Sequence, residues 1–216
     1  MKTIIKSLFF LLLISNQYLV SKNIEFYDII ILQNSQTGRF LGIEIGIGGK
    51  TTVKTFDKFN PNCKWKIQNA ESLENRISRI NFEFYNKSHS NTYKNNISDK
   101  KSTIGLMNKA PRINALAPKY LFMNNANELI ITRESKMYQK PWSFEIIEKH
   151  NPRETENHVS DGDLIKIKCK NKELGIQNEL PALLDEQILI KQKHLDPNRL
   201  WIVHKDHRQF NYQYWE

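Results

Sequence analysis

The sequence predicts an all-β protein, a β-trefoil built from three similar four-stranded modules behind an N-terminal signal peptide. Two observations lead to this fold class. Short apolar runs with period-two alternation and many β-branched residues recur along the chain, as is typical of strands, and no helical stripe follows the N-terminal segment. A leucine followed about two dozen residues later by a tryptophan also occurs three times, which indicates one structural unit used repeatedly.

Residues 1–21 have the pattern of a secretory signal peptide. Lys2 and Lys6 precede an apolar run over residues 8–14. This run has seven residues, whereas a helix needs roughly 20 to cross a bilayer. We therefore expect cleavage near residue 21, a mature chain without a membrane span, and a location in the endoplasmic reticulum lumen or outside the cell.

The trefoil is expected over residues 24–205, with the first module at about 24–68 and the third at about 159–205. In each module the tryptophan stands two residues before another apolar side chain, so both face the same side of a strand. This spacing predicts a buried core position for every leucine and tryptophan of the repeat. These residues are Leu41, Trp65, Leu121, Trp142, Leu174 and Trp201.

The middle module, at about 76–148, is longer than the other two. We expect its first strand at residues 80–86 and an insertion at about 88–118, where the chain is most polar. Asn86 and Asn96 begin glycosylation sequons, in agreement with a surface loop of a secreted protein. Residues 206–216 form a charged C-terminal tail in this interpretation.

The positive charge predicts no nucleic-acid partner. The net charge is +9, and it becomes +6 when residues 1–23 with their three lysines and no acid are removed. The remaining charge is spread along the chain. Lys166 and Lys168, for example, alternate with apolar residues, which indicates a solvated sheet face. Cys63 and Cys169 are predicted on strands that are not neighbours, and therefore to remain unpaired, without a disulfide.

No motif for catalysis, a cofactor or a metal is recognisable, so the chain is not expected to be an enzyme. His204 and His207 follow the last expected strand without a helix to align them, which argues against a metal site. Residues 46–50 lack the first glycine of a phosphate-binding loop and indicate a hairpin connection instead. Glycines allow close approach of a ligand, and Arg and Glu can bond hydroxyl groups. The candidate ligand-binding residues are Arg39, Glu44, Gly46, Gly48, Gly49 and Lys50.

Residues 30–41, followed by 46–53 and 62–65, resemble the first MIR module of stromal-cell-derived-factor-2-like proteins. In that module the strand pattern I-x-L-x-H-x-x-T-G-x-x-L precedes a glycine-rich loop and a closing tryptophan. Residues 163–201 similarly resemble the third module. The strand histidine of the pattern is replaced by Asn34 and Cys169. The resemblance implies a β-trefoil without catalysis of its own, which works around O-mannosylation and chaperone-assisted quality control in the endoplasmic reticulum.

Two other classes of trefoil stay open. A secreted ricin-B-like lectin shares the fold, but its Q-x-W motif is missing here, because Cys63, Lys140 and Arg199 occupy the glutamine positions. A structural or protease-inhibiting trefoil places its function in loops without recognisable motifs. The expected partner is a glycan, a glycosylated or unfolded protein, or a luminal chaperone. The last four residues differ from a KDEL-like signal, so retention and secretion are both open.

Overall fold

The computed structural model describes residues 23–70, 97–98, 102–109, 119–133, 139–152, 157–186 and 195–206. Within these ranges the chain forms twelve β-strands and three short 3-10 helices. The predicted signal peptide, the predicted strand at residues 80–86, and the sequon asparagines Asn86 and Asn96 lie outside the described residues.

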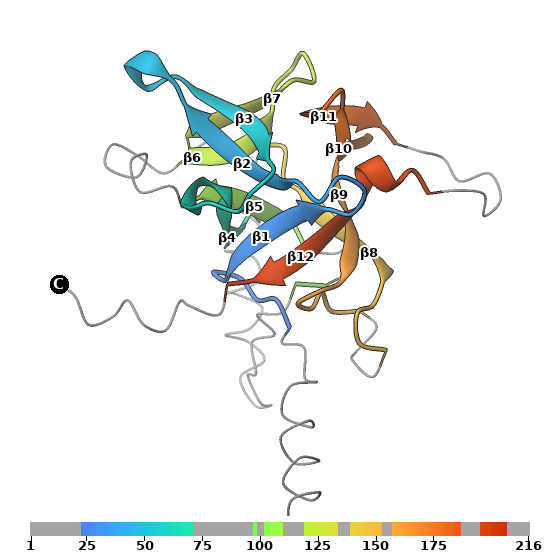
Figure 1. Ribbon diagram of the computed structural model, residues 1–216. Helices are drawn as coiled ribbons and strands as arrows, with labels where there is room; N and C mark the ends of the chain where they lie inside the picture. The colour runs from blue at the N-terminus through green and yellow to red at the C-terminus, as the bar shows by residue number, and fades with distance from the viewer. Residues whose placement is uncertain are drawn as a thin grey trace, which may run out of the picture.

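Six antiparallel strands form a barrel (Figure 1). They are β1 (Ile29–Asn34), β4 (Lys64–Asn69), β5 (Ile104–Asn108), β8 (Ser143–Glu148), β9 (Leu164–Cys169) and β12 (Trp201–Lys205). Strand ladders join β8 to β9, β9 to β12, β12 to β1, β1 to β4, and β4 to β5. A bridge between Ile104 and Trp142, with backbone hydrogen bonds of 2.8 and 2.9 Å, closes the ring. Closure leaves no unpaired edge between these strands.

Three hairpins lie together at one end of the barrel (Figure 1). The first consists of β2 (Phe40–Ile45) and β3 (Thr51–Phe56), the second of β6 (Lys119–Met123) and β7 (Leu129–Arg133), and the third of β10 (Lys172–Gln177) and β11 (Leu180–Asp185). Strands β3, β7 and β11 contact one another, so the hairpins form a common cap. A barrel of six strands capped by three hairpins is a β-trefoil, and the predicted fold class is confirmed.

The tryptophans occupy equivalent positions in the three modules. Each is at most 1% exposed. The indole Nε1 of Trp65 donates to the carbonyl oxygen of Leu41 at 2.9 Å, that of Trp142 to Leu121 at 2.9 Å, and that of Trp201 to Leu174 at 2.8 Å. The leucines are buried as well. Each module therefore contains one copy of the same Leu–Trp hydrogen bond, which satisfies a buried indole.

A second threefold feature joins neighbouring modules. Buried Asn34, at the end of β1, donates through Nδ2 to the carbonyl oxygens of Asn198 and Leu200, at 3.0 and 3.1 Å. Asn108, at the end of β5, donates to Asn62 at 2.9 Å. The thiol of Cys169, at the end of β9, makes the corresponding contact with Lys140 at 3.6 Å. Each of these bonds reaches the loop before the tryptophan of a neighbouring module: the third module for Asn34, the first for Asn108 and the second for Cys169. At the position of the strand histidine in the resembled pattern, a hydrogen-bond donor is therefore kept.

Two interpretations of polar segments need correction. The expected insertion at 88–118 contains β5, the first strand of the second module, whose Ile104 and Leu106 are fully buried. All five residues of β5 are buried, so the strand lacks the alternation that marks a half-exposed strand. Lys166 is not solvated either: it is 3% exposed, and its Nζ lies 2.9 Å from the fully buried carboxylate of Glu173.

His204 also lies elsewhere than expected. It belongs to β12 rather than to a tail, and its Nε2 lies 3.1 Å from Oε1 of Gln33 on the neighbouring strand. Burial lowers the pKa of its imidazole below the ordinary value. The ring is thus one of the outward-facing side chains of the β1–β12 pair.

Both cysteines are buried free thiols, and we predict that they resist alkylation in the native protein. Burial raises the pKa of Cys63, and raises that of Cys169 to about 11. Two pKa units correspond to an about 100-fold smaller thiolate fraction at pH 8. Iodoacetamide labelling followed by mass spectrometry should modify both thiols in denaturant without reductant, and Cys169 at least about 100-fold more slowly in buffer.

Ionisation of the Cys169 thiol should make the folded protein less stable at high pH. Because the pKa of Cys169 is higher in the folded state than its ordinary value of 9.0, its contribution to stability is complete below pH 9 and is lost as the pH rises toward 11. The alkylation prediction would be contradicted by a disulfide-linked peptide that contains Cys63 and Cys169, or by equally fast labelling with and without denaturant.

Candidate ligand-binding pocket

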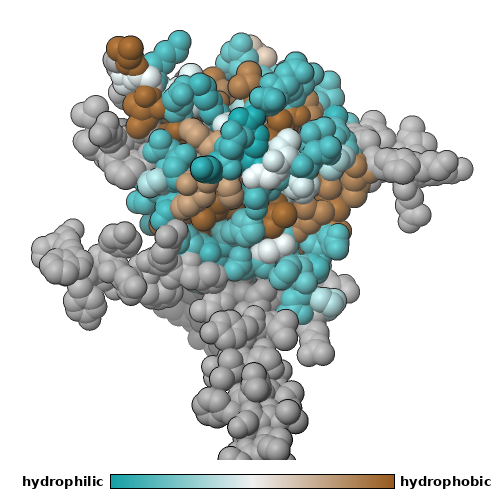
Figure 2. All heavy atoms as spheres, in the orientation of Figure 1, coloured by the Kyte–Doolittle hydropathy of each residue, from teal (hydrophilic) through white to brown (hydrophobic). Residues whose placement is uncertain are grey.

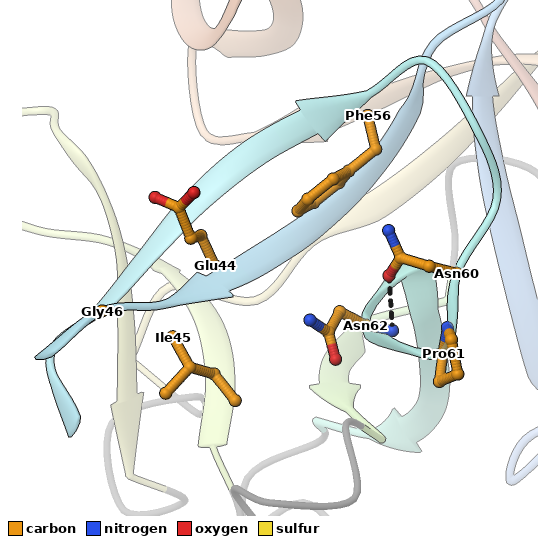
Figure 3. A pocket seen from close by; sticks show the side chains of 7 residues that line it. All are labelled: Glu44, Ile45, Gly46, Phe56, Asn60, Pro61 and Asn62. Carbon is orange, nitrogen blue, oxygen red and sulfur yellow. Dashed lines mark hydrogen bonds between the residues drawn. The ribbon is translucent and has the colours of Figure 1, made fainter.

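A pocket of about 550 Å³ lies between the β2–β3 hairpin and the 3-10 helix η2 (Pro61–Cys63). Its volume falls within the usual range for small-ligand sites. Figure 3 shows the asparagines of the turn on one side and the hairpin residues on the other. The lining residues are Glu44, Ile45, Gly46, Phe56, Asn60, Pro61 and Asn62.

The turn that forms one wall is held by its own sequence. Asn60 caps η2, because its Oδ1 accepts from the backbone N–H of Asn62 at 2.9 Å and its carbonyl oxygen accepts from Cys63 at 3.0 Å. Pro61 occupies the first helical position, where its missing N–H costs nothing and its fixed φ suits the turn. The side chain of Asn62 is therefore presented to the pocket by a locally determined turn (Figure 3).

The opposite wall depends on Gly42. A Cβ at this position would lie 2.9 Å from Cε2 of Phe56, 3.0 Å from the carbonyl oxygen of Asn62 and 3.0 Å from Sγ of Cys63. No larger residue fits without moving the ring or the turn. Glycine at position 42 thus lets the hairpin, the Phe56 ring and the turn approach one another around the pocket.

The lining groups suit a ligand rich in hydroxyls. Glu44 supplies a carboxylate, which forms an ion pair with Lys54, and the two asparagines supply amide donors and acceptors. Phe56, Ile45 and Pro61 add apolar surface, on which the C–H face of a ring can pack. Among the described residues, no group of three or more His, Cys, Asp or Glu side chains is placed to hold a metal ion. The arrangement suits recognition by hydrogen bonds and ring packing.

The structure brings together some of the predicted site residues. Glu44 and Gly46 line the pocket, and Gly46 donates its N–H to the carbonyl oxygen of Lys50 at 2.8 Å. Gly48 and Gly49 belong to the 3-10 helix η1 (Ile47–Gly49) at the hairpin tip, where Gly49 has a φ of 76°. Lys50 follows this turn and is exposed. These five residues lie at the end of the hairpin that includes the pocket.

Arg39 lies at the other end of the hairpin, just before β2, and the structure does not bring it together with residues 46–50. Glu44 is five residues further along the strand, a distance of about 17 Å in an extended chain. The guanidinium of Arg39 pairs with Asp57 at 2.9 Å and with Glu179 at 3.2 Å. The hydroxyl of Thr55 donates to the carbonyl oxygen of Glu179 at 2.7 Å. Arg39 therefore helps to join the first and third hairpins of the cap.

Sequence reasoning missed Phe56, Asn60 and Asn62. A usable signal was present, because residues 60–62, Asn-Pro-Asn, correspond to residues 196–198, Asp-Pro-Asn, before the third tryptophan. The second copy forms the 3-10 helix η4 (Pro197–Arg199), in which Asp196 Oδ1 accepts from the N–H of Asn198 at 3.0 Å. The same capped turn before Trp65 and before Trp201 predicts that the first and third modules have equivalent walls facing their hairpins.

No family model matches the chain, and no curated protein matches it. Among the described residues, no helix has the length and apolarity needed to cross a membrane.

Solved structures do resemble this one. An SDF2-like protein from Arabidopsis thaliana is 13% identical, with 84% of this chain and 94% of that chain covered and a TM-score of 0.49. A Caenorhabditis elegans protein with unknown function is 10% identical, with coverages of 84% and 95% and a TM-score of 0.49. The protein O-mannosyltransferase Pmt1-Pmt2 complex of S. cerevisiae, bound to the sugar donor, is 14% identical with a TM-score of 0.53.

The mannosyltransferase comparison covers 86% of this chain but 25% of the other. This chain thus corresponds to one part of that larger enzyme. At such low identity the likeness shows a common fold. The described part of the chain and a portion of the mannosyltransferase share the β-trefoil.

Proposed function

We propose that this chain is a non-enzymatic, MIR-type β-trefoil binding protein of the secretory pathway, which holds a neutral sugar of a glycan or a glycosylated protein in the pocket beside η2. The observation that supports the proposal best is the pocket itself, which Asn60, Asn62 and Glu44 line together with Phe56. The signal-peptide pattern supports the compartment, and the resemblance to MIR modules supports a role around O-mannosylated proteins.

Charge balance favours a neutral ligand over an acidic one. The carboxylate of Glu44 can accept hydrogen bonds from hydroxyls, and the ammonium group of Lys54 neutralises its charge. Among the described residues, the hydrogen bonds of Asn62 use its backbone N–H and carbonyl oxygen, which leaves its side-chain amide available for a ligand. Sugars offer the matching hydroxyls together with a C–H face for Phe56.

The replacement of Asn62 by Ala tests the pocket, and Asn198→Ala is its matched control. Each of the two residues follows the proline of a capped 3-10 turn, Asn62 in η2 and Asn198 in η4. We expect Asn62→Ala to weaken binding about tenfold, since one or two hydrogen bonds are lost, and Asn198→Ala to leave binding unchanged. Calorimetric titration with methyl α-mannoside and with a short O-mannosylated peptide measures both. Equal losses in the two variants, or no heat from either probe, would contradict the proposal.

A chaperone-associated role is the second candidate, supported by the cap surface. Ile47 at the tip of the β2–β3 hairpin is 103% exposed, and Leu180 at the start of β11 is 56% exposed. Figure 2 shows hydrophobic residues at the protruding end of the β2–β3 hairpin. If luminal folding factors are captured, Ile47→Ser should reduce their recovery while free sugars do not compete. Competition by free sugars would favour the glycan role, including that of a ricin-B-like lectin.

A further inference from the structure

We propose that, among the described residues, only the first module has an open sugar pocket, and that the residue two positions before each tryptophan determines this valency. The inference rests on the proposed function of the pocket. Three equivalent modules offer three equivalent spaces between a hairpin and the turn before a tryptophan. In the first module the residue at that position is Cys63, in the second Lys140 and in the third Arg199.

In the first module this side chain is short and buried, and it does not enter the space. The Sγ of Cys63 lies beneath Gly42, 3.0 Å from where a Cβ would stand. Gly42 adds no side chain, and the ring of Phe56 borders the opening. The volume between the hairpin and η2 is thus left for a ligand.

In the second module a long cation fills the corresponding space. The Nζ of Lys140 reaches across to the hairpin and donates to the carbonyl oxygen of Asn124 at 2.7 Å. Asn124 follows β6 at the position that Glu44 occupies in the first module, three residues after the repeated leucine. Phe122 replaces the glycine after that leucine, and Lys140 Nζ lies 5.8 Å from its ring centroid. In the second module, the side chains of Lys140 and Phe122 therefore occupy the space that is open in the first module.

In the third module the glycine and the turn are both retained, yet Arg199 fills the space. Its Nη1 lies 3.3 Å from Oε2 of Glu173 and donates to the carbonyl oxygen of Asp185 at the end of β11. Its Nε lies 3.3 Å from Asp196. A Cβ on Gly175 would meet Leu184 at 2.7 Å, so Leu184 stands where Phe56 stands in the first module. The guanidinium ties the turn to the hairpin instead of leaving a pocket.

One open pocket limits the kind of complex that can form. A protein with three such sites would cross-link branched or repeated glycans, with a large gain from multivalency. A protein with one site binds a single sugar unit per molecule, with the affinity of that site alone. We therefore infer a carrier or receptor for one glycosylated segment rather than a cross-linking lectin.

The indole signals of the three modules provide the test. Each Nε1–H is bonded to the leucine carbonyl next to the wall of its own module, so ¹⁵N-labelled protein titrated with methyl α-mannoside reports each space separately, with Trp→Phe variants for assignment. We expect saturation to shift the Trp65 signal, leave those of Trp142 and Trp201 in place, and give one site per molecule by calorimetry.

Arg199→Ser extends the test, because it should open the third space while Lys166 still pairs with Glu173. We expect a shift of the Trp201 signal and an increase from one site to two. Shifts of the Trp142 or Trp201 signal in the unmodified protein would overturn the single-pocket inference while leaving sugar binding established. No indole shift at any sugar concentration would overturn the proposed function itself. A folded Arg199→Ser variant that still binds one sugar would show that Arg199 does not close the third space.

Discussion

Replacing Glu173 by Leu is expected to destabilise the protein by about 3–5 kcal/mol, because it leaves the buried ammonium of Lys166 without its carboxylate. Glu173 is fully buried and Lys166 is 3% exposed, with 2.9 Å between Oε1 and Nζ. Arg199 loses its contact with Glu173 Oε2 in the same variant. Urea unfolding followed by tryptophan fluorescence gives the change in the free energy of unfolding.

Two variants serve as controls for this loss. Lys172 pairs with the exposed carboxylate of Asp185, and Lys172→Ala should cost much less than Glu173→Leu, because solvent screens an exposed pair. The double variant Lys166→Met with Glu173→Leu removes both buried charges and should recover much of the loss. If Glu173→Leu alone unfolds at the same urea concentration as the unmodified protein, the ion pair does not contribute as the structure indicates.

Truncating any one of the three repeated tryptophans to Ala is expected to cost about 3–5 kcal/mol. Trp65, Trp142 and Trp201 are at most 1% exposed, and each leaves both a cavity and an unpaired leucine carbonyl when removed. The losses should be similar, since each indole is buried and makes the same hydrogen bond to the leucine of its module. Thermal and urea unfolding of the three variants measure them.

The Trp→Phe variants separate the ring from its hydrogen bond. They keep most of the apolar volume and lose the indole N–H, so about 1–3 kcal/mol is expected at each position. An Ala variant of one tryptophan with unchanged stability would show that its module does not share the threefold core.

The threefold repeat could be predicted because it depends on the spacing of residues within short segments of the chain. Period-two alternation identifies most strands, and Leu41 with Trp65 recurs as Leu121 with Trp142 and Leu174 with Trp201. Strand β5 was missed for a physical reason: it is buried on both faces, so its composition does not alternate. The buried position of Lys166 was missed because its partner Glu173 belongs to the next strand.

In the pocket, too, some features follow from the local sequence and others depend on the folded chain. The capped turn at residues 60–63 follows from Asn-Pro-Asn by itself, and its third-module copy forms the same structure. The separation of Arg39 from the hairpin tip and its pairing with Glu179 of the third module appear only in the folded chain.

The all-β class, the three modules and the leucines and tryptophans at their centre follow from the amino-acid sequence alone, because each depends on spacing along one segment. The tertiary structure decided which of three equivalent spaces stays open. That outcome depends on how far the side chains of Cys63, Lys140 and Arg199 reach toward a facing hairpin. Such contacts join segments that are distant in the chain, and periodicity within one strand does not specify them.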